Sequence, residues 1–187
     1  MDAVDVARYA RHIALPEIGP EGQARICAAR VAVVGHDVAA ETAALYLRAA
    51  GCQVKQLSST LSLLVPMQFL SDVDLVVRPG FEDTPLDAEA ARLGLPLIAV
   101  RATDDAVDMV SFSGRVPSPA AQSVPFQAAG TPSTNDAAAV LAGTLAAAEA
   151  LHLIVRESSG PFTPSIRHLR LPLDGREPLV QTIGSPA

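Results

Sequence analysis

The sequence has no tryptophan, 4% aromatic residues and only two cysteines among its 187 residues. Because 49% of the chain is hydrophobic, its core must be built from small aliphatic side chains, and the abundant alanine favours helices that approach one another closely. Two cysteines are too few for a disulfide framework. Cys27 and Cys52 both lie beside alanine-rich stretches, so we predict a structural role for each as a small buried hydrophobe, with a reactive thiol as the alternative.

The sequence also lacks a basic stripe, and its net charge is −6. An acidic surface repels phosphate backbones, which argues against nucleic acid as a partner. Met1 is followed by Asp2 and Asp5 with no basic and no long apolar segment, so no signal peptide is predicted. Apolar runs are broken by glycine, proline or charge before they reach the length of a membrane span. We therefore expect a cytoplasmic protein that does not bind membranes.

Short apolar runs alternate with helical patterns along the chain. Residues 30–35 and 73–77 are β-branched runs of the kind that is buried on both faces in a parallel sheet. Further strands are predicted at 53–58, 95–100 and 109–112, and helices at 37–50, 83–93 and from 134 or 135 to 156. Two βαβ units result. We predict one domain over 1–187, an α/β fold with a Rossmann-like, mostly parallel sheet flanked by helices.

The remaining segments are less regular. Short helices are predicted at 4–13 and 21–28, residues 59–71 are ambiguous, and the proline-rich segment 114–132 is predicted to be an exposed loop. Asp174-Gly175 is a strong turn signal and predicts a C-terminal β-hairpin from 166–173 and 179–183. In the last helix one stripe at helical spacing is predicted to form its apolar face. The stripe comprises Val140, Leu141, Thr144, Leu145, Ala148, Leu151, His152 and Val155.

The turn after the first strand has the position of a nucleotide-binding loop. Such a loop reads G-x-G-x-x-G, whereas this chain has Gly35-His-Asp-Val-Ala-Ala40. Gly35 permits the tight turn and Ala40 permits close helix packing, but Asp37 occupies the position where the backbone should approach phosphate oxygens. A carboxylate ~4 Å from a phosphate charge costs about 4 kcal/mol at an effective dielectric constant near 20. Asp37 is instead placed to cap the helix, and the turn is predicted to serve packing.

Several motifs together resemble a known family. Arg8-Tyr-Ala-Arg11, then Gly22-Gln23 and the strand 30–35, are similar to the opening R-Y-x-R-Q, G-Q and strand of ThiF/MoeB/HesA proteins. Weaker similarity continues at 73–77 and 92–98. This is the ubiquitin-activating superfamily, whose members adenylate the C-terminal glycine of a small β-grasp protein. The resemblance implies a Rossmann-type fold and places the N-terminal segment 1–29 at a dimer interface.

The departures from that pattern concern the ATP site. Asp37, Val38 and Ala40 replace the glycine-rich loop, Ser58 stands where the resemblance implies a ribose-binding acid, and Arg78 stands where it implies a magnesium-associated aspartate. Segment 59–71 is too short for the family's phosphate-binding arginine and lysine. The catalytic cysteine and the paired C-x-x-C zinc motifs are missing, so no metal site is expected. We predict that no cofactor binds, with ATP possible only in a rearranged site or one supplied by a partner.

One implied functional residue is retained. Arg11 matches the second arginine of R-Y-x-R-Q, which in family dimers can reach ATP bound by the other subunit; the alternative is a solvated or acid-paired arginine. We therefore expect a non-catalytic dimer partner, in a homodimer or a heterodimer, for a ThiF-like adenylating subunit or a β-grasp sulfur carrier. The alternatives are an adenylyltransferase with a rearranged nucleotide site and a small-ligand-binding regulatory module.

Other polar residues give weaker signals. None of the four histidines has metal-ligand spacing, and His152 is expected to be a core or interface residue. Asp104, Asp105 and Asp108 follow a strand end, where a divalent ion could bind, but an exposed acidic loop is the favoured interpretation. The other histidines are His12, His36 and His168.

Overall fold

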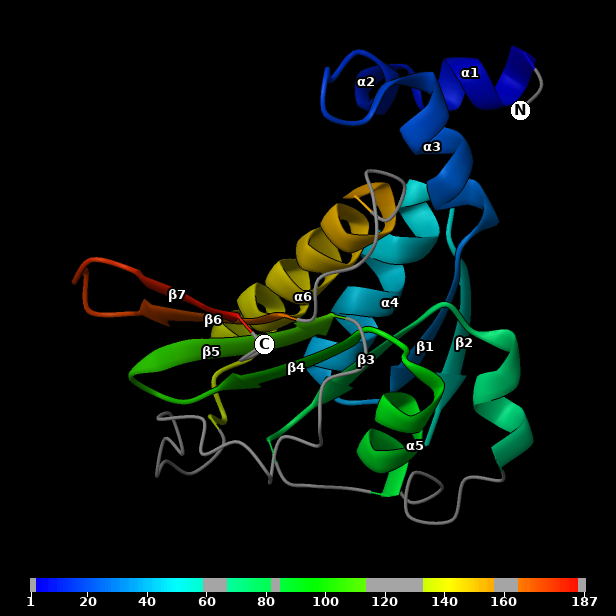
Figure 1. Ribbon diagram of the computed structural model, residues 1–187. Helices are drawn as coiled ribbons and strands as arrows, with labels where there is room; N and C mark the ends of the chain where they lie inside the picture. Colours follow the sequence, from blue (N-terminus) through cyan, green and yellow to red (C-terminus); the bar gives the residue numbers. More distant parts are fainter. Residues whose placement is uncertain (1–2, 59–66, 82–84, 114–132, 157–164, 185–187) are drawn as a thin grey trace.

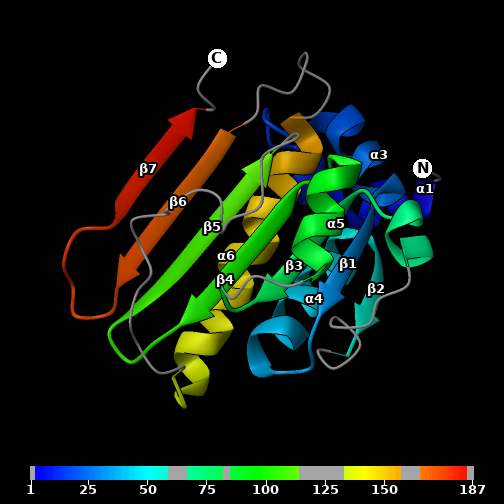
Figure 2. The same cartoon turned by 60° about the horizontal axis from the view of Figure 1, so that its bottom comes forward.

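The computed structural model describes residues 3–58, 67–81, 85–113, 133–156 and 165–184. Seven strands form one sheet in the order β2-β1-β3-β4-β5-β6-β7 (Figures 1 and 2). The first four strands run parallel, and β5, β6 and β7 extend the sheet in antiparallel order. The strands are β1 (Arg30–Val34), β2 (Gln53–Leu57), β3 (Leu75–Pro79), β4 (Leu97–Ala102), β5 (Ala106–Ser113), β6 (Ser165–Pro172) and β7 (Leu179–Gly184).

Helices cover both faces of the parallel half of the sheet (Figure 2). One apolar cluster joins the sheet to α4 and α6, and a second joins its other face to α5 and the 3-10 helix η2. The predicted α/β class, both βαβ units and the C-terminal hairpin are confirmed. The helices are α1 (Ala3–Arg8), α2 (Ala10–Ile13), α3 (Gly19–Ala28), α4 (Val38–Ala50), η2 (Met67–Asp72), α5 (Pro85–Leu93) and α6 (Asp136–Arg156).

Most of the predicted helices and strands agree with the structure to within two or three residues, with a few differences. β5 is longer than predicted because it pairs along its whole length with β6. The ambiguous stretch contributes η2, and its first part, 59–66, lies outside the described residues, as does the predicted loop 114–132. The predicted helix 4–13 is two helices, because the chain turns at Tyr9. The Tyr9 side chain is buried and its hydroxyl lies against Gly51.

The sheet-facing side of α6 differs from the predicted stripe. Its buried residues are mainly alanines together with Gly143, whereas Val140 and His152 are exposed. The prediction selects the larger apolar side chains, but the close approach of α6 to α4 and the sheet requires the smallest ones. A Cβ atom at Gly143 would contact the carbonyl oxygen of Ala39 in α4 and lie 2.8 Å from Thr42 Cβ. The expected tight packing between helices is therefore confirmed, but α6 makes it with the face opposite to the predicted stripe.

By length and mean hydropathy (1.8), α6 could cross a membrane, contrary to the prediction that no apolar run is long enough. A core helix passes the same test. In this structure 44% of its apolar window is buried, and α6 packs against α4 and the sheet. We interpret α6 as a core helix.

The two cysteines differ in exposure. Cys52 is buried, and this burial raises the pKa of its thiol to about 12. Its predicted role as a small hydrophobe is confirmed, since it belongs to the apolar cluster beneath α4. Cys27 is half-buried, and its sulfur accepts a hydrogen bond from the Gln23 amide at 3.4 Å.

Candidate functional site

The candidate site is the region where β1 and β3 end. From β1 the chain continues to β2 on one side of it and then returns to β3 on the other side. The carboxyl ends of β1 and β3 therefore flank a topological switch point. Ligands of open α/β sheets bind at such points. Gly35 follows β1 here, and Gly80 follows β3.

The Gly35 turn is closely packed. Gly35 has a φ of +100°, a conformation that favours glycine. A Cβ atom at this position would lie 3.3 Å from Pro79 Cγ and 3.4 Å from Ala40 Cβ. The tight turn and the close contact with Ala40 agree with the sequence interpretation. The turn after β1 therefore lies close against the side chains of Pro79 in β3 and Ala40 in α4, with little room for a side chain at position 35.

Asp37 caps α4, as expected. Its carboxylate accepts a hydrogen bond of 2.8 Å from the Ala40 backbone N–H group. The positive end of the helix dipole, which in a nucleotide-binding loop faces a phosphate, here already faces a carboxylate. A bound phosphate would have to approach this negative charge.

The cap predicts a measurable stability effect. Asp37→Ala should lower the free energy of unfolding by about 1 kcal/mol, because it leaves a first-turn N–H group of α4 without its side-chain acceptor. Urea unfolding followed by circular dichroism measures the change. Asp37→Asn is the matched control and should retain most of the stability, since asparagine caps about as well as aspartate. Equal losses in the two variants would show that the charge, and not the cap, stabilises the turn.

A polar network that the sequence interpretation missed closes the other side of the turn. The Gln56 side chain in β2 donates hydrogen bonds to the Gly35 carbonyl oxygen (3.1 Å) and to the Glu41 carboxylate (2.8 Å). Glu41 also contacts His36 Nδ1 at 3.0 Å. These residues fall on separate elements, and no spacing in the sequence signals their contact. A second carboxylate, Glu41, therefore lies beside the start of α4.

Arg78 forms a buried ion pair at the end of β3. Its guanidinium group donates to both carboxylate oxygens of Asp87 in α5, at 2.7 and 2.8 Å, and to the Gly80 carbonyl oxygen at 2.6 Å. The two side chains are 3% and 0% exposed. A guanidinium group held here disfavours a divalent cation. Its charge is compensated by Asp87, so it is also a weak attractor for phosphate.

The last predicted site residue on this edge, Ser58, follows β2 and is half-buried. Within the ranges that the structure describes, no group of three histidine, cysteine or acidic side chains is placed to hold a metal ion. The triphosphate–magnesium site that the resemblance implies thus does not fit the residues found at this edge: a capping carboxylate, a second carboxylate and a compensated arginine.

Arg11 lies at the opposite end of the molecule. It is exposed on α2, whereas Gly35 lies at the far end of α4, a helix ~20 Å long (Figure 1). Arg11 therefore does not reach the candidate site of its own chain. Its neighbour His12 hydrogen-bonds to the buried Gln23 at 2.9 Å.

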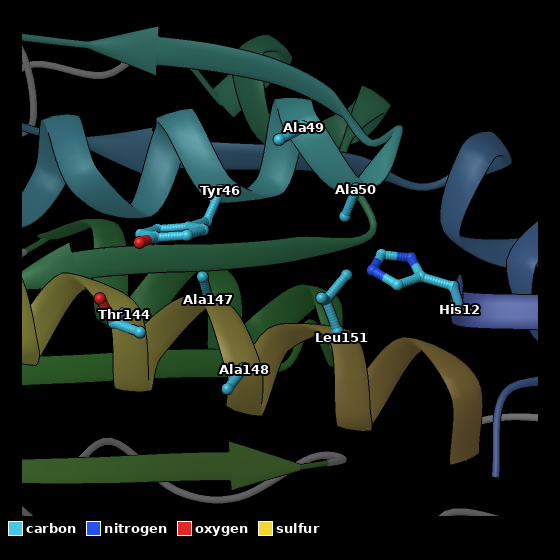
Figure 3. A pocket seen from close by; sticks show the side chains of 8 residues that line it. All are labelled: His12, Tyr46, Ala49, Ala50, Thr144, Ala147, Ala148 and Leu151. Atoms are coloured by element: carbon cyan, nitrogen blue, oxygen red, sulfur yellow. The ribbon is translucent and has the colours of Figure 1, made fainter. Parts of the chain in front are cut away.

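His12 also lines a pocket of about 240 Å³ between α2, α4 and α6. In Figure 3 the Tyr46 ring of α4 lies over this groove, and the His12 ring points towards Leu151 of α6. The other lining residues are small, and Tyr46 is 48% exposed. The remaining lining residues are Ala49, Ala50, Thr144, Ala147 and Ala148.

The acidic residues after β4 do not form one exposed loop. Asp108 is fully buried in β5, where it pairs with Arg170 at 3.2 Å and lies 3.6 Å from the buried His168. Asp104 instead accepts a hydrogen bond from Ser133. The favoured interpretation is wrong for Asp108, because β5 begins at Ala106, earlier than predicted, and Asp108 lies within this buried strand. Of the two positions expected for His152, the core position is wrong, since His152 is exposed, and the interface position stays a prediction.

No family model matches the chain. A segment of 51 residues is 47% identical to the SAMP-activating enzyme E1 of Haloferax volcanii, and covers 27% of this chain and 19% of that protein. A segment of 47 residues is 47% identical to the probable adenylyltransferase/sulfurtransferase MoeZ of Mycobacterium tuberculosis, and covers 25% of this chain and 12% of that protein. The matches therefore span less than a fifth of these relatives.

Solved structures share the fold over nearly the whole chain. The crystal structure of PaaA has a TM-score of 0.71 at 11% sequence identity, and the alignment covers 100% of this chain and 76% of PaaA. The complex of Escherichia coli MccB with MccA-N7isoASN has a TM-score of 0.66 at 14% identity, with 95% and 72% of the two chains covered. At these identities the likeness shows the fold.

The sheet order and the edge formed by β1 and β3 define a Rossmann-type α/β protein. The chain is thus similar in sequence, over about a quarter of its length, to the SAMP-activating enzyme E1 and to MoeZ, and it is similar in fold to PaaA and MccB.

Proposed function

We propose that the chain is a non-catalytic, cytoplasmic partner or scaffold for a ThiF/MoeB-like adenylating subunit or for its β-grasp sulfur-carrier protein. The observation that carries the proposal is the buried Arg78–Asp87 pair at the end of β3. Together with the Asp37 cap, it replaces groups that attract phosphate and magnesium by groups that disfavour both. Adenylation depends on positioning and charge neutralisation, and neither is supported at this edge.

The partner surface in this proposal is the groove between α2, α4 and α6. The elements that form it carry exposed apolar side chains, Leu45 (64% exposed) and Tyr46 on α4 and Leu15 directly after α2. Exposed apolar groups that gather beside a concave surface are typical of protein interaction sites. Arg11 lies on the same short helix as His12 of the groove, so a subunit docked here would have an exposed guanidinium group at its surface. Arg11 would then contact nucleotide bound by that subunit.

The test uses the tagged full chain and the proteins encoded beside its gene. We expect it to co-purify with an identified ThiF/MoeB-like or β-grasp protein. Ala148→Glu, which places a charge in the groove, should reduce the binding at least tenfold. Ala88→Glu is the matched control, because Ala88 is an exposed alanine on α5, on the opposite face. A chain that binds neither class of protein would contradict the proposal.

The role of Arg11 has a separate readout. Arg11→Ala should lower ATP–pyrophosphate exchange by the adenylating partner while the two proteins still bind, and Arg11→Lys should restore part of the rate. Unchanged exchange in the bound complex would leave Arg11 as a surface arginine without this function.

The second candidate function is an adenylyltransferase with a rearranged nucleotide site. It is favoured by the names of the matched relatives, of which MoeZ is a probable adenylyltransferase/sulfurtransferase. Calorimetry of the isolated chain with ATP and magnesium, NAD or S-adenosylmethionine separates the two functions. Micromolar affinity that is lost in Asp37→Ala or Ser58→Ala would favour an adenylyltransferase with a rearranged site. Absence of binding would support the non-catalytic partner function.

A further inference from the structure

The far end of the sheet is an open strand edge. β7 pairs with β6 on one side, and it is the last strand of the sheet in the part of the chain that the structure describes. The β6–β7 hairpin projects away from α4 and α6 (Figures 1 and 2). Residues 173–182 are exposed, including Leu179 (40%) and Val180 (51%). Among the described residues, no strand pairs with the outer N–H and C=O groups of β7, so this edge can accept a further strand.

Within the described residues, β7 itself carries none of three common protections against edge pairing. Proteins block open edges with lysine or other charges, with proline or with a β-bulge. Leu179–Gly184 contains no charged residue and no proline. Its register with β6 continues without interruption from Arg170↔Leu179 to Ser165↔Gly184, so no bulge turns the edge away.

We propose that β7 pairs antiparallel with β7 of a second copy of this chain around a two-fold axis, which joins two sheets into one. Such an axis joins each face of one sheet to the same face of the other. Two residues that lie opposite each other across the axis must therefore have side chains on the same face. Along β7, residues that are an even number of positions apart have their side chains on the same face. The register centred on Gln181 satisfies this condition and includes both Leu179 and Val180 in the pairing.

In this register Gln181 lies opposite its own copy and Val180 lies opposite Thr182 of the second copy. No like charges meet across the axis, although the chain as a whole is acidic. The pairing buries exposed apolar side chains, which favours association. This interface is independent of the helical groove, and both can be occupied in one assembly.

Sedimentation of the full chain between 1 and 200 µM should show a monomer–dimer equilibrium. Gln181→Lys places two ammonium groups directly opposite each other and should weaken the dimer roughly tenfold or more. Gln53→Lys, an exposed glutamine on β2 at the opposite edge of the sheet, is the matched control and should leave the dimer unchanged. A chain that is monomeric at 200 µM, or a dimer that Gln181→Lys does not weaken, would overturn the proposal.

Cysteine crosslinking tests the register. With oxidised glutathione as the acceptor of the two electrons, Gln181→Cys should form a disulfide-linked dimer. Thr182→Cys alone should not, but a mixture of Thr182→Cys and Val180→Cys chains should. The unsubstituted chain reports any background from Cys27. Crosslinking of Thr182→Cys alone, with none of Gln181→Cys, would overturn the proposed register. Because the experiment contains no other protein, its failure leaves the proposed partner function unaffected.

Discussion

Asp87→Ala should be among the most destabilising single substitutions in the chain, with a loss of about 3–5 kcal/mol in the free energy of unfolding. The variant leaves the Arg78 guanidinium group, 3% exposed, without the carboxylate that accepts two of its hydrogen bonds. The remaining acceptors are the carbonyl oxygens of Gly80 and Pro79. These satisfy part of its hydrogen bonding but do not compensate its charge.

Urea unfolding of Asp87→Ala and of the double variant Arg78→Met/Asp87→Leu provides the measurement and its control. The double variant removes both charges and replaces them with apolar groups, so it should recover most of the lost stability. If Asp87→Ala cost less than about 1 kcal/mol, the pair would be solvated in solution. The edge of β3 would then be open to a ligand, which would weaken the proposed loss of the nucleotide site.

The surroundings of this ion pair show how far the sequence predicts the site. The strand β3 is predictable because its apolar run from Leu75 to Val77 is a local signal, and the same holds for β1. Asp37 is a predictable cap because its partner, Ala40, is three residues away. The sequence also marks Arg78 as a departure from a motif. It does not indicate the partner of Arg78, because that contact depends on how α5 packs on the sheet.

The face of α6 is harder to predict for a different reason. Hydrophobicity selects the stripe with Val140 and Leu151, but the distance between α4 and α6 is set by the smallest residues, which carry little hydrophobic signal. The network of Gln56 with the Gly35 turn escapes prediction because it joins two strands whose register the sequence does not specify.

Gly143→Ala should lower the free energy of unfolding by about 1–3 kcal/mol, although alanine favours helices more than glycine by about 1 kcal/mol. The added methyl group would contact the Ala39 carbonyl oxygen and lie 2.8 Å from Thr42 Cβ. A backbone carbonyl in the first turns of α4 cannot rotate away as a side chain does. The two helices must therefore separate, and their alanine contacts with each other and with the sheet weaken together.

Gly22→Ala in α3 is the matched control for this substitution. Its Cβ atom would meet only side-chain methyl groups, Ile18 Cγ2 at 3.2 Å and Val155 Cγ1 at 3.4 Å, which can shift by a few tenths of an ångström. We expect a change of under about 1 kcal/mol there, because helix propensity and mild crowding oppose each other. Thermal and urea unfolding of both variants measure the difference. If Gly143→Ala were as stable as Gly22→Ala, α4 and α6 could move apart freely, and the groove they form with α2 would lack the rigid walls that the proposed partner site requires.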